Sequence, residues 1–245
     1  MTAGSPAPAS GMFARTFRSL RVYNYRLFFV SQVISMSGTW MQSVAQNWLV
    51  LSLTDSAVAL GVTVGLQFGP VLVFGAWGGT LADRADKRRL LMATQAAAAV
   101  LALALGILAV SDVVTVWMIW VLAGLTGTVT ALGIPSQQSF LYEMVGPDDL
   151  ANAVGLNSVV INSSRIIGPA IGAVLIAGVG VASCFFINSA SFVAVIVALA
   201  VMRVAELHRS APVPREPGQV RAGLKYAWRT PSLRVPLLML AVVST

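Results

Sequence analysis

Long uncharged apolar runs alternate along the chain with short polar breaks. A run of about 20 residues can cross the hydrocarbon layer of a membrane as one helix. The run at residues 150–202 is too long for one helix, and Gly178-Val179-Gly180 is its natural break into a fifth and a sixth span. The pattern predicts an all-α polytopic membrane protein with a six-helix bundle in residues 25–202. The first four predicted spans are residues 27–53, 57–80, 90–110 and 113–133.

The segments outside these runs have a different composition. Residues 1–24 are predicted to form a cytoplasmic tail, and residues 134–149 a polar connector between the fourth and fifth spans. Residues 203–234 are rich in arginine and contain several prolines, which predicts a cytoplasmic linker. Residues 235–245 are mostly apolar but too few to cross a bilayer. We therefore expect the start of a seventh transmembrane helix there, with either a missing C-terminal half after it or a partner against which this end packs.

All lysines and arginines except Arg165 fall in three blocks between the apolar runs. Cytoplasmic loops of membrane proteins carry an excess of Lys and Arg, so we expect all three blocks on the cytoplasmic side. This orientation predicts a multi-pass protein of the cell's inner membrane with a cytoplasmic N-terminus. The blocks are Arg15, Arg18, Arg21 and Arg26; Arg84, Lys87, Arg88 and Arg89; and Arg203, Arg209, Arg215, Arg221, Lys225, Arg229 and Arg234.

The composition excludes several classes of function. Apolar residues make up 57% of the chain and charged residues only 10%, whereas about 25% of the residues in soluble domains are charged. We therefore expect a lipid bilayer to surround this protein. The pI near 10.5 does not indicate nucleic-acid binding, because the basic residues flank apolar spans. Cys184 is the only cysteine and His208 the only histidine in the sequence, which argues against a disulfide, a metal centre or a catalytic triad. Since a phosphate-binding loop motif is also missing, we expect no enzyme and no cofactor.

Arg165 is the one cation within an apolar run. A guanidinium at membrane depth is costly unless it is paired or solvated, so Arg165 is expected to face protein or a hydrated cavity. Ser158, Asn162 and Arg165 share one helical face. Gln42 and Gln46 belong to a polar stripe on the first span, and we predict that all five line a substrate path. Two alternatives stay open: hydrogen bonds between helices for the glutamines, and a structural ion pair with the missing half for Arg165.

The loop after the second span carries an ordered motif, Gly79-Thr80-Leu81-Ala82-Asp83-Arg84-Ala85-Asp86-Lys87-Arg88-Arg89-Leu90. It resembles the loop signature of the major facilitator superfamily, although Asp86 stands where that family usually has a second glycine. The resemblance implies an inner gate, in which Asp83 caps a helix of the opposite half and basic residues pair with carboxylates. The alternative is a generic basic loop that only sets orientation. The expected gate residues are Gly79, Asp83, Arg84, Lys87, Arg88 and Glu143.

A second motif lies in the fifth span. Gly155, Ser164, Gly168-Pro169 and Gly172 resemble the glycine-proline signature of the superfamily's antiporters, with Ser164 in place of one glycine. Small residues allow helices to approach closely, and a proline bends a helix. The resemblance therefore implies a pivot formed by Gly155, Gly168, Pro169 and Gly172. Tight packing without a pivoting role is the alternative.

Several further segments look like the enterobactin-exporter and macrolide-efflux branch of this superfamily. They are Phe17-Arg18-Ser19-Leu20, the segments 152–157 and 165–169, and the segment 186–192. The resemblance implies a bundle of two inverted three-helix repeats that works with a second bundle by alternating access. It also implies a secondary active exporter of a small organic molecule such as a siderophore or a drug. The alternatives are an uptake permease of the same fold and a membrane scaffold or sensor that transports nothing.

The energy source is expected to be a proton or cation gradient. The predicted spans contain no Asp or Glu at membrane depth. We therefore expect the coupling site in the missing half, or at Asp55 or Asp112 in the short turns near the outer face. A buried cation without a buried anion favours neutral or anionic cargo.

Overall fold

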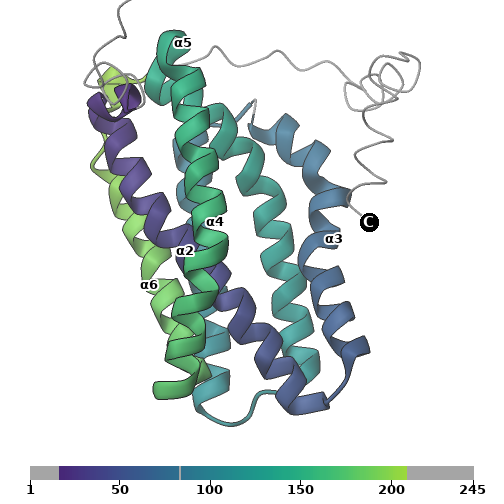
Figure 1. Ribbon diagram of the computed structural model, residues 1–245. Coiled ribbons are helices and arrows are strands. Elements are labelled where there is room, and N and C mark those ends of the chain that lie inside the picture. Colours follow the sequence, from purple (N-terminus) through teal and green to yellow (C-terminus); the bar gives the residue numbers. More distant parts are fainter. Residues whose placement is uncertain (1–16, 83, 209–245) are drawn as a thin grey trace, which may run out of the picture.

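The computed structural model describes residues 17–82 and 84–208. Within these ranges the chain is helical and contains no strand, which confirms the predicted all-α class. Figure 1 shows the long helices side by side in one bundle. The beginning of the predicted tail, most of the linker, the seventh helix and Asp83 lie outside the described residues. The elements are the 3-10 helix η1 (Arg18–Arg21), α2 (Tyr23–Thr54), α3 (Ala57–Ala82), α4 (Lys87–Val110), α5 (Val116–Gly178), α6 (Val181–Ala200) and the 3-10 helix η2 (Val204–Glu206).

Helix α5 consists of two spans joined at a sharp break, here called α5a (residues 116–145) and α5b (residues 147–178). Gly146 between them has φ 70° and ψ −177°, a conformation that glycine adopts without steric cost. Pro147 follows, and a proline is well tolerated at the start of a helix because its missing N–H is not needed there. Figure 1 shows α5 doubling back at this point. Counting α5 as two, the described residues form the six spans expected from the sequence.

The prediction of a separate polar connector at residues 134–149 is wrong. These residues extend α5a up to Gly146 and begin α5b after it, so the chain turns within a single residue. Pro135 lies inside α5a without ending it. Two of the polar side chains in this stretch, Gln137 and Gln138, line a pocket.

Helix α2 lies against two partners in the middle of the bundle. It packs on α5 and α6, while α3 packs mainly on α5, and α4 packs on α6 and α5. Two clusters of buried apolar side chains hold these helices together. The first contains Tyr25, Phe28, Phe140, Met144 and Leu199. The second contains Met41, Ala45, Leu105, Ile119 and Phe185.

The outside of the bundle is apolar. Helices α3 to α6 each contain a stretch long and apolar enough to cross a membrane. Leu72 is 87% exposed, and Ile166 and Val174 are also largely exposed. Helix α2 places polar Gln32 and Gln46 in the interior, the reverse of a water-soluble amphipathic helix. This arrangement matches lipid or a second hydrophobic bundle as the surroundings.

Candidate functional site

The glutamines of α2 lie inside the bundle. Gln42 is 9% exposed and Gln46 is 4% exposed. The Oε1 atom of Gln42 accepts a hydrogen bond of 2.7 Å from Nδ2 of Asn188 in α6, and Ser191 donates to Oδ1 of Asn188 at 3.0 Å. Gln42 and Gln46 are predicted to line a substrate path with Arg165, and in this bundle both are buried on α2 whereas Arg165 is exposed on α5b. Gln42 forms the hydrogen bond between helices that the alternative for these residues expects.

Replacing Asn188 with leucine is expected to destabilise the bundle by about 1–3 kcal/mol, because the buried carbonyl of Gln42 loses its donor. Asn162→Leu is the matched control. Asn162 is exposed, and its Nδ2 donates at 2.8 Å to the carbonyl of Ser158 in its own helix. Thermal unfolding of the detergent-purified protein measures both effects. Equal shifts of the midpoint for the two variants would contradict the interior network.

Arg165 is on an exposed face of α5b together with Ser158 and Asn162. Its guanidinium carbon lies 5.3 Å from the centroid of the Trp40 ring of α2, a cation–π contact. No salt bridge joins Arg165 to any acidic residue in the described ranges. The structure therefore brings together three of the five predicted path residues. It also shows an aromatic neighbour, Trp40, that the sequence analysis did not assign.

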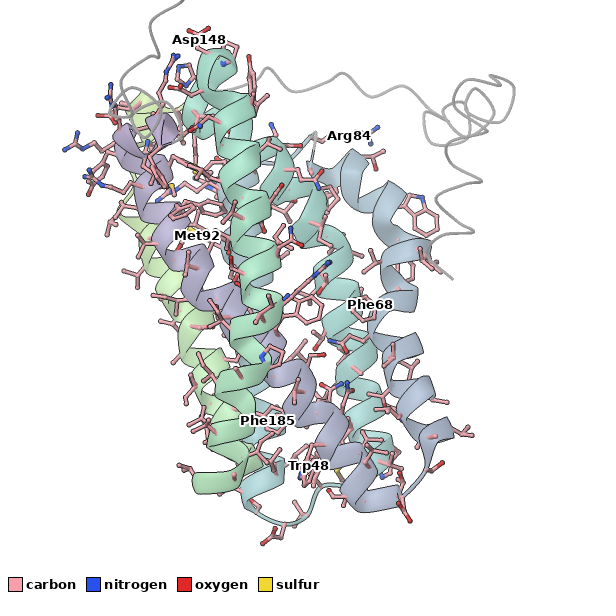
Figure 2. All side chains as sticks on the ribbon, in the orientation of Figure 1. Trp48, Phe68, Arg84, Met92, Asp148 and Phe185 are labelled. Carbon is pink, nitrogen blue, oxygen red and sulfur yellow. The ribbon has the colours of Figure 1, made fainter. Side chains whose placement is uncertain are left out.

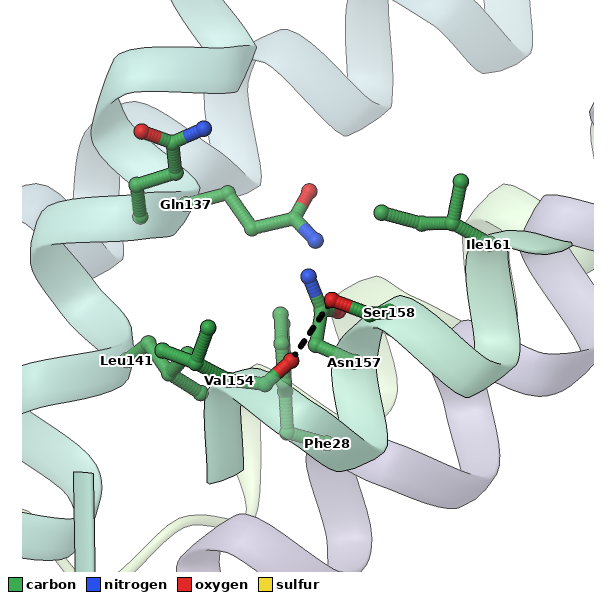
Figure 3. A pocket seen from close by; sticks show the side chains of 8 residues that line it. Phe28, Gln137, Leu141, Val154, Asn157, Ser158 and Ile161 are labelled. Carbon is green, nitrogen blue, oxygen red and sulfur yellow. Dashed lines mark hydrogen bonds between the residues drawn. The ribbon is translucent and has the colours of Figure 1, made fainter. Parts of the chain in front are cut away.

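A cavity of about 340 Å³ opens beside this face, between α5a and α5b. Ser158 is one of its lining residues, and its hydroxyl donates at 3.0 Å to the carbonyl of Val154. Figure 3 shows side chains from both parts of α5 converging on the cavity. The other lining residues are Phe28, Gln137, Gln138, Leu141, Val154, Asn157 and Ile161.

The amides of this cavity were missed as site residues by the sequence analysis. Gln137 and Gln138 belong to the polar stretch 134–149, which the sequence predicts as a connector. The sequence signal that could have identified them is that these two adjacent amides directly continue an apolar helix. Once α5 folds back at Gly146, that position brings them opposite Asn157 and Ser158.

The predicted gate loop contains a buried ion pair. Nζ of Lys87, at the start of α4, lies 2.7 Å from Oε1 of Glu143 in α5a, and both side chains are 9% exposed. This is the expected pairing of a loop cation with Glu143. Asp86, the departure from the family pattern, caps α4, because its Oδ1 accepts a hydrogen bond of 3.0 Å from the backbone N–H of Arg89.

The remaining gate residues have different surroundings. Arg88 donates to two carbonyls at the C-terminal end of α6, from Nε to Leu199 at 2.6 Å and from an Nη to Ala200 at 3.0 Å. Its guanidinium therefore fastens α4 to α6 within this bundle. Arg84 is partly buried, and a side chain added at Gly79 would meet open space.

The predicted pivot residues divide into two groups. A Cβ atom added at Gly168 would lie 2.6 Å from both the carbonyl oxygen of Ser37 and Cβ of Trp40 in α2. One at Gly172 would lie 3.4 Å from Met41. Gly155 differs, since an added Cβ there meets nothing within 4 Å. Gly168 and Gly172 therefore pack closely against α2, and Pro169 lies between them inside α5.

The chain is similar in sequence to several known membrane transporters. The staphyloferrin A transporter of Staphylococcus aureus is 32% identical over 153 residues, which cover 62% of this chain and 38% of that protein. The multidrug efflux pump Tap of Mycolicibacterium fortuitum is 29% identical over 85% of this chain and 53% of its own length. The enterobactin exporter EntS of Salmonella paratyphi A is 23% identical over 79% of this chain and 45% of its own length. The chain spans about half the length, or less, of these relatives.

A family profile described as transmembrane secretion effector matches residues 14–244, nearly the whole chain. Its relatives include transporters of siderophores and of drugs. The helical bundle, its apolar surface and the loop motif after α3 agree with this match. The chain therefore belongs to the transmembrane secretion effector family of the major facilitator superfamily, whose members are membrane transporters and not enzymes.

Proposed function

We propose that this bundle is the N-terminal half of a secondary active exporter that carries a small organic molecule across the cell's inner membrane. A second bundle of the same kind would complete it, and the two would rock about a path between them. The N-terminus and the Lys87 loop would lie in the cytoplasm. A proton or cation gradient would supply the energy, through a titratable group in the second half or at Asp55 or Asp112.

The surroundings of Arg165 support this function most strongly. It lies on an exposed face in an apolar span, stacked on Trp40, with no acidic partner in the described residues. A guanidinium at membrane depth must be solvated or bound. A path filled with water and substrate provides that, so Arg165, Asn162 and Ser158 would line it.

The charge of Arg165 selects the cargo. Guanidinium groups bind carboxylate and other oxyanions through charge-assisted hydrogen bonds. The neighbouring cavity adds the amides of Gln137, Gln138 and Asn157, which bind neutral polar groups. Anionic or neutral siderophore-like molecules therefore fit this surface better than cationic drugs.

The inner gate would form around the loop after α3. The buried Lys87–Glu143 pair and the bonds of Arg88 to α6 hold the base of this loop firmly to the bundle. Asp83 and Arg84 would then meet the second half, with Gly79 allowing it to come close. The ridge of Gly168, Pro169 and Gly172 against α2 would serve as the pivot.

The Arg165→Ala variant is expected to lower transport of an anionic siderophore by at least about tenfold, because a charge-assisted hydrogen bond to the cargo is lost. Everted membrane vesicles that contain the intact transporter measure uptake of labelled cargo. Arg165→Lys is expected to retain part of the activity. Arg89→Ala, which removes an exposed charge at the start of α4, is the control. Unchanged transport in Arg165→Ala would show that this residue does not contact cargo.

The same vesicles decide the direction of movement. An exporter accumulates cargo in energised everted vesicles, whereas an uptake permease accumulates it in right-side-out vesicles. A scaffold or sensor accumulates it in neither. Dissipating the gradient with a protonophore is expected to stop accumulation by a secondary transporter.

A further inference from the structure

Two arginines converge at the end of the bundle where α2 begins and α6 ends. The guanidinium carbon of Arg203 lies 4.4 Å from the centroid of the Tyr23 ring, and that of Arg26 lies 5.9 Å from the same centroid. Arg203 is tied there, because its backbone N–H donates at 2.9 Å to Asn24 and its carbonyl accepts from Asn24 at 3.0 Å. The fold thus holds two cations around one aromatic ring. Tyr23, Arg26 and Arg203 are here called the Tyr23 cluster.

The acidic groups near these arginines neutralise little of their charge. Glu206 forms an exposed salt bridge of 3.1 Å with Arg203, and exposed pairs of this kind are weak. Arg26 is exposed and forms no salt bridge with any residue of the described part of the chain. The cluster therefore has an excess of positive charge at the edge of the membrane-spanning region.

An apolar groove of about 400 Å³ begins at Arg26 and continues between α2 and α6. Along α2 it extends from Arg26 to Ile34, about 12 Å at 1.5 Å per residue. Nothing charged lines it apart from Arg26. The groove residues are Arg26, Leu27, Val30, Ser31, Ile34, Ala194, Val197, Ala198 and Val201.

We propose that this groove and the Tyr23 cluster form a binding site for one anionic phospholipid, with its phosphate at Arg26 and Arg203 and an acyl chain along Val30, Ile34 and Val197. A basic cluster at the membrane surface attracts anionic headgroups, and an apolar groove that starts at that cluster receives the attached chain. Neutral lipids would contact the rest of the apolar perimeter, where α3 exposes residues such as Leu72. What distinguishes this site is Arg26 in the groove lining, together with the guanidinium of Arg203 against the same Tyr23 ring.

The test uses the intact protein in phosphatidylcholine nanodiscs that contain a small share of phosphatidylglycerol with a photoreactive acyl chain. After illumination, mass spectrometry maps the cross-linked peptides. We expect cross-links concentrated in residues 26–34 and 194–201. The variant Arg26→Gln/Arg203→Gln should lower that yield by about five- to twenty-fivefold, about fivefold for each arginine. Arg89→Gln, an equal loss of charge at another exposed position, should leave it unchanged.

Three results would overturn the proposal. One is cross-linking spread evenly over the apolar perimeter, including α3. Another is an equal yield in the groove from photoreactive phosphatidylcholine. The third is the same yield in the double variant as in the unmodified protein. Thermal unfolding in detergent without added lipid confirms that the double variant is folded, so a lost cross-link reports lipid binding.

Discussion

Replacing Lys87 with methionine is expected to destabilise the bundle by about 3–5 kcal/mol. The carboxylate of Glu143, 2.7 Å away and 9% exposed, would lose its ammonium partner while staying buried between α4 and α5a. Removing one member of a buried ion pair costs far more than the pair itself contributes. The temperature at which half of the detergent-purified protein remains monodisperse measures the loss.

Two control variants distinguish the effect of burying an ion pair from the effect of removing a charge. Lys87→Met/Glu143→Leu removes both charges together and is expected to recover most of the lost stability. The exposed pair of Arg203 and Glu206 has side chains 61% and 47% exposed, so Glu206→Gln should change stability by less than about 1 kcal/mol. If Lys87→Met were as mild as Glu206→Gln, the Lys87–Glu143 pair would not be buried as described.

Replacing Gly168 with leucine is expected to separate α2 from α5b and to destabilise the bundle by about 3 kcal/mol or more. Even the first carbon of a side chain would lie 2.6 Å from the Ser37 carbonyl oxygen and from Cβ of Trp40. The Ser37 oxygen is backbone and cannot rotate away, so the helices must move apart. The same unfolding assay measures the effect, and transport in vesicles is expected to be lost with it.

Gly155→Leu is the matched control on the same helix. An added Cβ at Gly155 meets open space, so the variant should keep its stability apart from the small difference in helix propensity. Comparable destabilisation by both substitutions would contradict the close approach at Gly168. A loss of transport without a loss of stability in Gly155→Leu would indicate that another part of the transporter packs against this position.

Hydrophobic runs were sufficient to predict the spans, because lipid tolerates few charges within a membrane helix. The pairing of a loop cation with Glu143 was also expected, because the resemblance of the loop motif implies that its basic residues pair with carboxylates. The turn at Gly146 was missed, although a Gly-Pro pair is a strong signal for a break. The polar residues around it suggested a loop, whereas Gln137 and Gln138 are helical and line a cavity.

The spacing of polar residues alone could not show which side of each helix faces the bundle interior and which side is exposed. Gln42 and Gln46 repeat with helical periodicity, and so do Asn162 and Arg165. Periodicity shows that such residues share a face, but it does not show whether that face meets another helix or an open path. Only packing decides: Asn188 of α6 covers Gln42, and the face of α5b around Arg165 is exposed in this bundle.

In the proposed transporter, the exposed polar face of α5b lines a water-filled path. The reactivity of a cysteine introduced at Asn162 tests this most directly. In the intact transporter, Asn162→Cys is expected to react with a membrane-impermeant thiol reagent, at a rate that added cargo lowers. Val100→Cys, on the apolar outside of α4, should not react, and the buried Cys184 gives little background. If Asn162→Cys stays unreactive from both sides of the membrane, with and without cargo, this face lines no path.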